Sequence, residues 1–126
     1  MKAISVKQPW AALIAVGWKW IETRTWSTDY RGPLLIVASK QPDRVAMQSL
    51  YDQPDTLEMI EPLLVYGKAV CRCVLVNCRP MSQEDEQLAR CVCYPGAYAW
   101  VLNRIERIEP FLVRGQLGLY DVEVPA

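Results

Sequence analysis

The stretch that decides the fold is Gly17-Trp18-Lys19-Trp20-Ile21-Glu22-Thr23-Arg24-Thr25-Trp26. Its aromatic and β-branched residues are typical of a strand, which we expect over residues 18–26. Alternation along a strand puts Glu22 and Arg24 on one face and Lys19 on the other. Lys19 and Glu22 can share a cleft only if the chain is irregular just after Gly17, where a glycine favours a bulge or turn.

Three ionisable side chains of both signs, Lys19, Glu22 and Arg24, lie inside this aromatic stretch and span only six residues. A lysine in dehydrated aromatic surroundings can act as a base or nucleophile, and Glu22 could exchange protons with a substrate. The fork of Arg24 can hold a carboxylate, a phosphate or the edge of a base. The alternative is a strand whose charges pair with one another and with water, which is common and contributes little. Lys19 and Glu22 are therefore the candidate catalytic residues.

Outward from this stretch, short strands alternate with short helices. We expect a strand over 3–6, and Pro9 opens an apolar helix to Val16 that is buried or plugs the end of a barrel. Further strands are expected over 34–38, 67–77, 97–102 and 117–123, helices over 42–51 and 82–90, and an extended connection over 108–115. The sum is a mixed α+β domain: a small, closed or strongly bent β-structure of five or six strands with two or three short helices.

Composition limits the possible functions. The 126 residues, 52% hydrophobic and 22% charged, predict one globular domain over residues 1–126. The chain has no histidine, which excludes Ser-His-Asp and Cys-His nucleophiles and imidazole proton transfer. No apolar run approaches the roughly 20 residues of a membrane span, and the N-terminus lacks the apolar stretch of a signal peptide. We expect a cytoplasmic protein without membrane contact.

The cysteines allow two interpretations. They are Cys71, Cys73, Cys78, Cys91 and Cys93. Two C-x-C pairs could form a thiolate metal site, but structural zinc sites favour C-x2-4-C spacing. Buried cysteine commonly serves as a small apolar side chain. We expect this second role, with no metal and no cofactor.

Charge is uneven along a chain whose formal net charge is zero. Residues 1–40 hold six basic and two acidic side chains and four of the five tryptophans, whereas residues 41–66 hold one basic and five acidic side chains. Net neutrality argues against attachment to nucleic acid by bulk electrostatics. Basic groups interleaved with aromatic rings suit stacking on a base and holding a phosphate. The alternative is that the tryptophans fill a core and the basic groups face solvent.

Three runs together resemble one known family: Ser5-Val6-Lys7-Gln8-Pro9-Trp10-Ala11, the Gly17–Trp26 stretch, and Tyr30-Arg31-Gly32 with the apolar run after it. They resemble the ASCH domain, a branch of the PUA-like superfamily. The resemblance implies a PUA-like small β-barrel with a cleft lined by the Lys–Glu–Arg segment, which binds RNA or a modified nucleoside. One base would lie against Trp26, Trp10 or Tyr30 while Gln8 and Glu22 read its edge. The expected phosphate contacts are Lys7, Lys19, Arg24 and Arg31.

Two other functions stay open. Bacterial ASCH relatives are amidohydrolases that deacetylate N4-acetylcytidine with a lysine, a threonine three positions later and a glutamate from a later strand. Lys19 matches that lysine, but Glu22 stands at the threonine position, Thr23 is one position off, and residues 70–78 hold no acid. A variant mechanism would use Glu22 as the base on a water, with Lys19 stabilising the oxyanion. The third possibility is a coregulator-like protein-interaction module that uses the Asp-rich segment 52–62.

Overall fold

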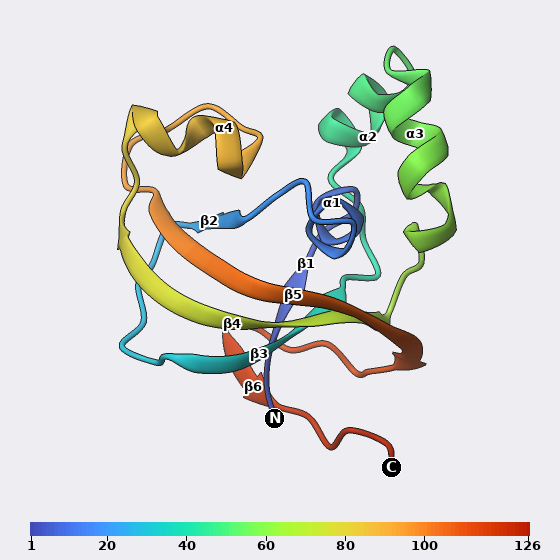
Figure 1. Ribbon diagram of the computed structural model, residues 1–126, viewed down its shortest axis with the longest axis vertical. Helices are drawn as coiled ribbons and strands as arrows, with labels where there is room; N and C mark the ends of the chain where they lie inside the picture. The colour runs from blue at the N-terminus through green and yellow to red at the C-terminus, as the bar shows by residue number, and fades with distance from the viewer.

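A curled six-stranded sheet forms the body of the protein. The computed structural model describes residues 1–126, and the strands follow the order β2-β5-β4-β3-β1-β6. Their bounds are β1 (Lys2–Val6), β2 (Ile21–Arg24), β3 (Gly32–Ala38), β4 (Lys68–Pro80), β5 (Tyr98–Leu112) and β6 (Leu119–Asp121). Only β1 and β3 pair in parallel. The sheet bends into a half-barrel with β2 and β6 at its two edges, as Figure 1 shows, which confirms the predicted bent α+β structure.

The curl comes from the two long strands at the centre of the sheet. The pairing of β4 with β5 shifts register at three places, and such bulges bend a strand and increase its twist. The predicted connection over 108–115 is wrong for residues 108–112, because β5 stays paired with β4 as far as the pair Lys68–Leu112, and only residues 113–115 lie outside a strand. Pro110 is tolerated in this half of β5 because β2 covers only Tyr98–Val101, so the other edge of the strand is free.

The structure has four α-helices, one more than the upper limit expected from the sequence. They are α1 (Trp10–Ala15), α2 (Arg44–Leu50), α3 (Pro54–Ile60) and α4 (Glu86–Ala89), with 3-10 turns at Glu61–Leu63 and Gln83–Asp85. The addition is α3, which begins with Pro54 in the first turn, where a missing N–H costs nothing. None of the four helices has both the length and the apolar character that a membrane span needs.

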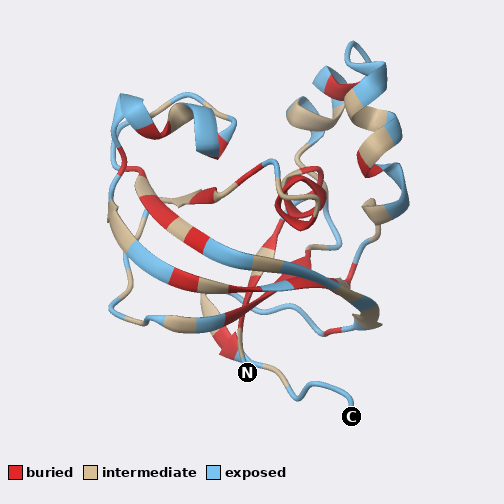
Figure 2. Cartoon of the chain, in the orientation of Figure 1, coloured by how far each residue is buried: buried red, intermediate tan, exposed pale blue.

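Helix α1 closes one end of the half-barrel, as its apolar sequence predicts. Its residues Ala11–Ala15 are buried, and Figure 2 shows the helix buried nearly all round. The main core joins α1 to the inner face of the sheet through side chains such as Ile14, Leu34, Ile36 and Trp100. This burial fixes the position of α1, and with it the position of Trp10 at its start.

Cys71 and Cys73 belong to this core. They are 0% and 3% exposed and share one face of β4. Burial raises the pKa of the Cys73 thiol to about 12 and that of Cys71 well above its usual range. Both thiols therefore stay protonated at neutral pH and pack as small apolar side chains.

The expected long strand over 18–26 is wrong at both ends, because β2 begins only at Ile21 and stops at Arg24, and its late start has a clear cause. The backbone N–H groups of Trp18 and Lys19 both donate to the carbonyl of Leu13, at 3.0 and 3.1 Å. Gly17 before them has a φ of +84°, the left-handed region that glycine adopts readily. The chain thus wraps the end of α1 before it enters β2, which is the irregular turn that the Lys19–Glu22 pairing requires.

An ion pair anchors the segment that carries α4. Arg79 donates to both carboxylate oxygens of Asp85, at 2.8 and 2.9 Å. Asp85 also accepts from the backbone N–H of Ser82, which completes the predicted capping box. The hydrogen bonds from Arg79, and then those from Ser82, hold the pKa of Asp85 below its usual range.

Replacing Asp85 with Asn is expected to lower the free energy of unfolding by about 1–3 kcal/mol at neutral pH, because hydrogen bonds to a charged group are lost. A depressed folded-state pKa stabilises the fold above the ordinary aspartate pKa of about 3.9, and this contribution disappears as the pH falls through the lower folded-state value. Urea unfolding from pH 7 to pH 2 should therefore show the two proteins converging below about pH 4. Asp29→Asn, at an exposed aspartate without a side-chain partner, is the control and should track the wild type. A constant gap between Asp85→Asn and wild type at all pH values would contradict the assignment.

Candidate functional site

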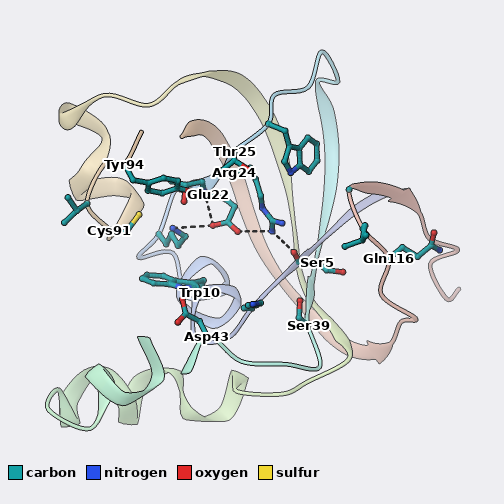
Figure 3. Close-up of a pocket in the computed structure, with 17 residues that line it drawn as sticks. Ser5, Trp10, Glu22, Arg24, Thr25, Ser39, Asp43, Cys91, Tyr94 and Gln116 are labelled. Atoms are coloured by element: carbon teal, nitrogen blue, oxygen red, sulfur yellow. Dashed lines mark hydrogen bonds and ion pairs between the residues drawn. The ribbon is translucent and has the colours of Figure 1, made fainter. Parts of the chain in front are cut away.

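A cleft of about 600 Å³ opens beside the free edge of β2. Its wall is formed by side chains from β1, α1 and β2 and from the loops that connect the elements around it, as Figure 3 shows. The lining residues are Ser5, Lys7, Trp10, Lys19, Glu22, Thr23, Arg24, Thr25, Trp26, Ser39, Asp43, Cys91, Val92, Tyr94, Gln116, Leu117 and Gly118. The cleft thus gathers residues from almost the whole length of the chain.

Lys19 is the most buried charge of the cleft, with a side chain only 1% exposed. Its Nζ donates to the carbonyl of Ala89 at 2.5 Å and lies 3.5 Å from Oε1 of Glu22. The same Nζ lies 4.8 Å from the centroid of the Trp10 ring, within the range of a cation–π contact. A carbonyl, a carboxylate and a ring face therefore compensate the ammonium within the protein.

Glu22 continues this chain of contacts to Arg24. Its Oε2 accepts from Nη2 of Arg24 at 3.1 Å, and its Oε1 accepts from the backbone N–H of Thr23 at 3.1 Å. The same Arg24 nitrogen donates to the carbonyl of Ser5 at 2.5 Å, so the guanidinium connects β2 to β1. Nε of Arg24 is buried without a hydrogen-bond partner. Such an unsatisfied donor is costly and marks this guanidinium as capable of a further contact.

Trp10 and Asp43 form another part of the wall. Nε1 of Trp10 donates to Oδ2 of Asp43 at 2.9 Å, while Oδ1 of Asp43 accepts from the backbone N–H of Ala46 and caps α2. The bond from Trp10, helped by Ala46 and by the positive charge of Lys7, lowers the pKa of Asp43 despite partial burial. Asp43 is therefore ionised at neutral pH. The three basic and two acidic side chains of the lining leave the cleft with a net charge of +1.

Aromatic rings surround the row of charged side chains formed by Lys19, Glu22 and Arg24. Figure 3 shows Tyr94 and Trp10 on opposite sides of the carboxylate of Glu22. Trp26 is held by an edge-on contact with Trp100, with ring centroids 4.8 Å apart. The rim carries Leu117, whose residue surface is 99% exposed. The cleft can therefore place a flat polar ring between aromatic faces with charged groups at its edge.

Five of the candidate site residues line this cleft: Trp10, Lys19, Glu22, Arg24 and Trp26. Gln8 does not. It is fully buried, and its Nε2 donates to the carbonyls of Leu63 and Val65 at 2.8 and 3.0 Å. Its Oε1 accepts from the backbone N–H of Ala12 at 2.9 Å. Both amide hydrogens are used inside the protein, so Gln8 fixes α1 to the segment before β4 instead of facing a ligand.

Tyr30 and Arg31 also lie outside the lining. The hydroxyl of Tyr30 donates to the carbonyl of Pro33 at 2.6 Å. Arg31 donates to the carbonyls of Thr28 and Tyr30 at 2.8 Å and reaches that of Cys78 at 3.3 Å. Both side chains are occupied in the turn that leads into β3, where neighbouring carbonyls are the nearest acceptors.

Sequence reasoning missed several members of the lining, above all Asp43 and Tyr94. In the sequence, Asp43 lies at the start of the helix predicted over 42–51, and Tyr94 precedes Pro95 and Gly96 in a run typical of a turn. Thr23 lines the cleft although strand alternation turns it to the other face. Asp43 and Tyr94 reach the cleft through tertiary packing of distant segments, for which a single sequence offers no periodic signal.

A curled sheet with a helix plugging one end and a polar cleft at its open edge defines the PUA-like class of small domains. The ASCH domain model matches residues 4–112, and the chain belongs to the ASCH domain family. Among solved structures it is similar to a mutant ASCH protein from Zymomonas mobilis, with a TM-score of 0.61 and 12% identity over 97% of this chain and 89% of the other. At that identity the likeness shows the fold alone. A search of curated proteins found no match.

Gln8→Ala is expected to lower the free energy of unfolding by about 2–4 kcal/mol, because it leaves two carbonyls and one backbone N–H of the interior without a partner. Urea unfolding measures this loss. Gln48→Ala, on the exposed face of α2, is the matched control and should change stability by less than about 0.5 kcal/mol. Equal losses in the two variants would refute the structural role of Gln8.

Glu22→Gln is expected to cost about 3 kcal/mol of stability, because it leaves the buried ammonium of Lys19 without its carboxylate. A double-mutant cycle with Lys19→Met tests the cause. The loss in the double variant should be smaller than the sum of the two single losses, since removing both charges removes the unpaired cation. Strict additivity of the losses would mean that the two side chains do not interact.

Proposed function

We propose that this protein binds one base of single-stranded RNA or of a modified nucleoside in the cleft beside β2. The observation that carries the proposal is the chain of contacts from Lys19 through Glu22 to Arg24, flanked by aromatic rings. Stacking on an aromatic side chain contributes about 1–3 kcal/mol per base, and polar groups at the edge of the ring then select the base.

The base would stack against Tyr94 or against the face of Trp10 that Lys19 does not cover, with Trp26 completing the wall. Glu22 would accept from donors on the edge of the base. Arg24 would donate to an acceptor there through its Nε, the donor that has no partner inside the protein. Tyr94 thereby takes the place that the sequence suggested for Tyr30.

Lys7 is the side chain that would contact a phosphate. This side chain lines the cleft, is exposed, and has no ion-pair or hydrogen-bond partner for its ammonium. Lys19 is too buried and too fully compensated to reach a backbone phosphate. The net charge of +1 in the cleft of a protein with no net charge suits a short ligand better than a long duplex.

A second candidate is the amidohydrolase variant, favoured by the 3.5 Å separation of Lys19 Nζ and Glu22 Oε1 inside a cleft. Binding without turnover fits the contacts better. The variant mechanism needs the ammonium of Lys19 to stabilise an oxyanion. That ammonium is already engaged on three sides, by the carbonyl of Ala89, the carboxylate of Glu22 and the ring of Trp10.

The test is a titration followed by tryptophan fluorescence, with a panel of modified nucleosides that includes N4-acetylcytidine and with short single-stranded RNA oligomers. The wild type should bind, and Lys7→Ala should weaken binding of the oligomers and reduce the slope of log Kd against log salt by about 1. Arg107→Ala, an exposed arginine of β5 outside the cleft, is the charge-matched control and should leave affinity and slope unchanged.

The same mixtures are analysed by chromatography for released acyl groups. Release by the wild type that is abolished in Lys19→Ala would establish the amidohydrolase instead. Absence of both binding and release across the panel and the oligomers would refute the proposed function.

A further inference from the structure

Asp43 has no role in the base contacts described above, yet it lines the cleft. It is held ionised, its carboxylate is fixed at both oxygens, and it forms no salt bridge within the protein. Glu22 differs, because it is paired with two cations. Asp43 is therefore the one carboxylate of the cleft whose negative charge is not directly paired.

The carboxylate of Asp43 also retains acceptor capacity. Two carboxylate oxygens offer about four acceptor positions, and here Oδ2 accepts from Trp10 and Oδ1 from the backbone N–H of Ala46. The backbone N–H of Val45 also acts on this carboxylate, which leaves at least one acceptor position for a ligand. An ionised acceptor forms hydrogen bonds roughly twice as strong as a neutral one, so its preferred partner is a hydroxyl or amino donor.

The position of Asp43 relative to Trp10 indicates which donor it meets. Asp43 is hydrogen-bonded to the nitrogen edge of the indole ring. A base stacked on Trp10 carries its sugar beyond the edge of the ring, since the glycosidic bond lies in the plane of the base. Lys7, whose charge acts on Asp43, also lines the cleft and is the proposed phosphate contact. A ring for the base, an acid bonded to the edge of that ring and a lysine whose charge reaches the acid are the three groups that a base, its sugar and its phosphate would need.

We propose that Asp43 accepts a hydrogen bond from the 2′-hydroxyl of the ligand's ribose and makes the cleft selective for ribonucleotides over deoxyribonucleotides. Carboxylates hold ribose hydroxyls in this manner in dinucleotide-binding folds, and the 2′-hydroxyl is the group by which a protein distinguishes RNA from DNA. This inference rests on the proposed function, because it assumes that a nucleotide occupies the cleft.

The experiment measures Kd for three pools of random-sequence single-stranded octamers, with ribose, 2′-deoxyribose and 2′-O-methylribose. The wild type should bind the ribose pool roughly tenfold more tightly than either other pool, which corresponds to about 1.4 kcal/mol. The 2′-O-methyl pool separates loss of the hydroxyl donor from a change of sugar shape. The pools contain the same bases, so a contact between Asp43 and a base amino group would not discriminate among them.

Asp43→Asn and Asp43→Ser should bring the ratio of deoxyribose to ribose Kd close to 1. Both substitutions keep a side chain that caps a helix, and thermal melting verifies that each variant is folded. Asp52→Asn removes an exposed acid from the turn after α2 and should keep the wild-type ratio. Trp10→Phe removes the indole donor but leaves Asp43 in place; it should weaken all three pools while keeping the ratio.

The outcomes separate the two proposals. Equal affinity of the wild type for the ribose and deoxyribose pools, or an unchanged ratio in Asp43→Asn and Asp43→Ser, would overturn the role of Asp43 and leave base binding intact. Binding of none of the pools, with no binding in the nucleoside panel, would overturn the proposed function and this inference together. A ratio that collapses equally in Trp10→Phe would assign the selectivity to the indole instead of to the carboxylate.

Discussion

The arrangement of the cleft depends on one buried positive charge, the ammonium of Lys19. A charge taken out of water is tolerated only when the protein compensates it closely. Here the compensation comes from three elements at once, through the carbonyl of Ala89 at the end of α4, the carboxylate of Glu22 on β2 and the ring of Trp10 at the start of α1. Through Arg24 the same chain reaches the carbonyl of Ser5 on β1. The apolar core sets the positions of these elements, and the compensation of this one charge links them at the cleft.

This compensation matters because the sheet does not close. β2 pairs on one side only with β5, and on its other side no strand pairs with it. In a closed barrel the backbone of a neighbouring strand would satisfy that edge and fill the space beside it. Here the guanidinium of Arg24 spans from β2 to β1 in place of a strand. The cleft is the space that remains, so the same feature that leaves the half-barrel open creates a site with polar groups along one wall.

Local signals in the sequence were sufficient for part of this structure. Pro9 opens α1, the Ser82 capping box starts the segment leading to α4, and the apolar run before Ala38 is a buried strand, because each depends on neighbouring residues alone. The late start of β2 was not predictable by alternation, since the carbonyl of Leu13 captures two N–H groups. Asp43 and Tyr94 were missed for a related reason: only tertiary packing brings them to Glu22. Gln8 was a plausible ligand contact by sequence, but buried carbonyls from a distant segment use its amide.

The energetics of the cleft argue that its charges serve more than stability. Replacing a buried ion pair with well-packed apolar side chains is often neutral or stabilising, so a fold of this size has no thermodynamic need for a buried lysine. Nε of Arg24 is moreover buried without a partner, which costs free energy in the unliganded protein. Costs of this kind persist where a ligand offsets them, because an incoming acceptor satisfies the donor and the preformed charges require no reorganisation. A polar, aromatic ligand, as proposed above, would offset this cost by completing the hydrogen bonds at the polar end of the half-barrel.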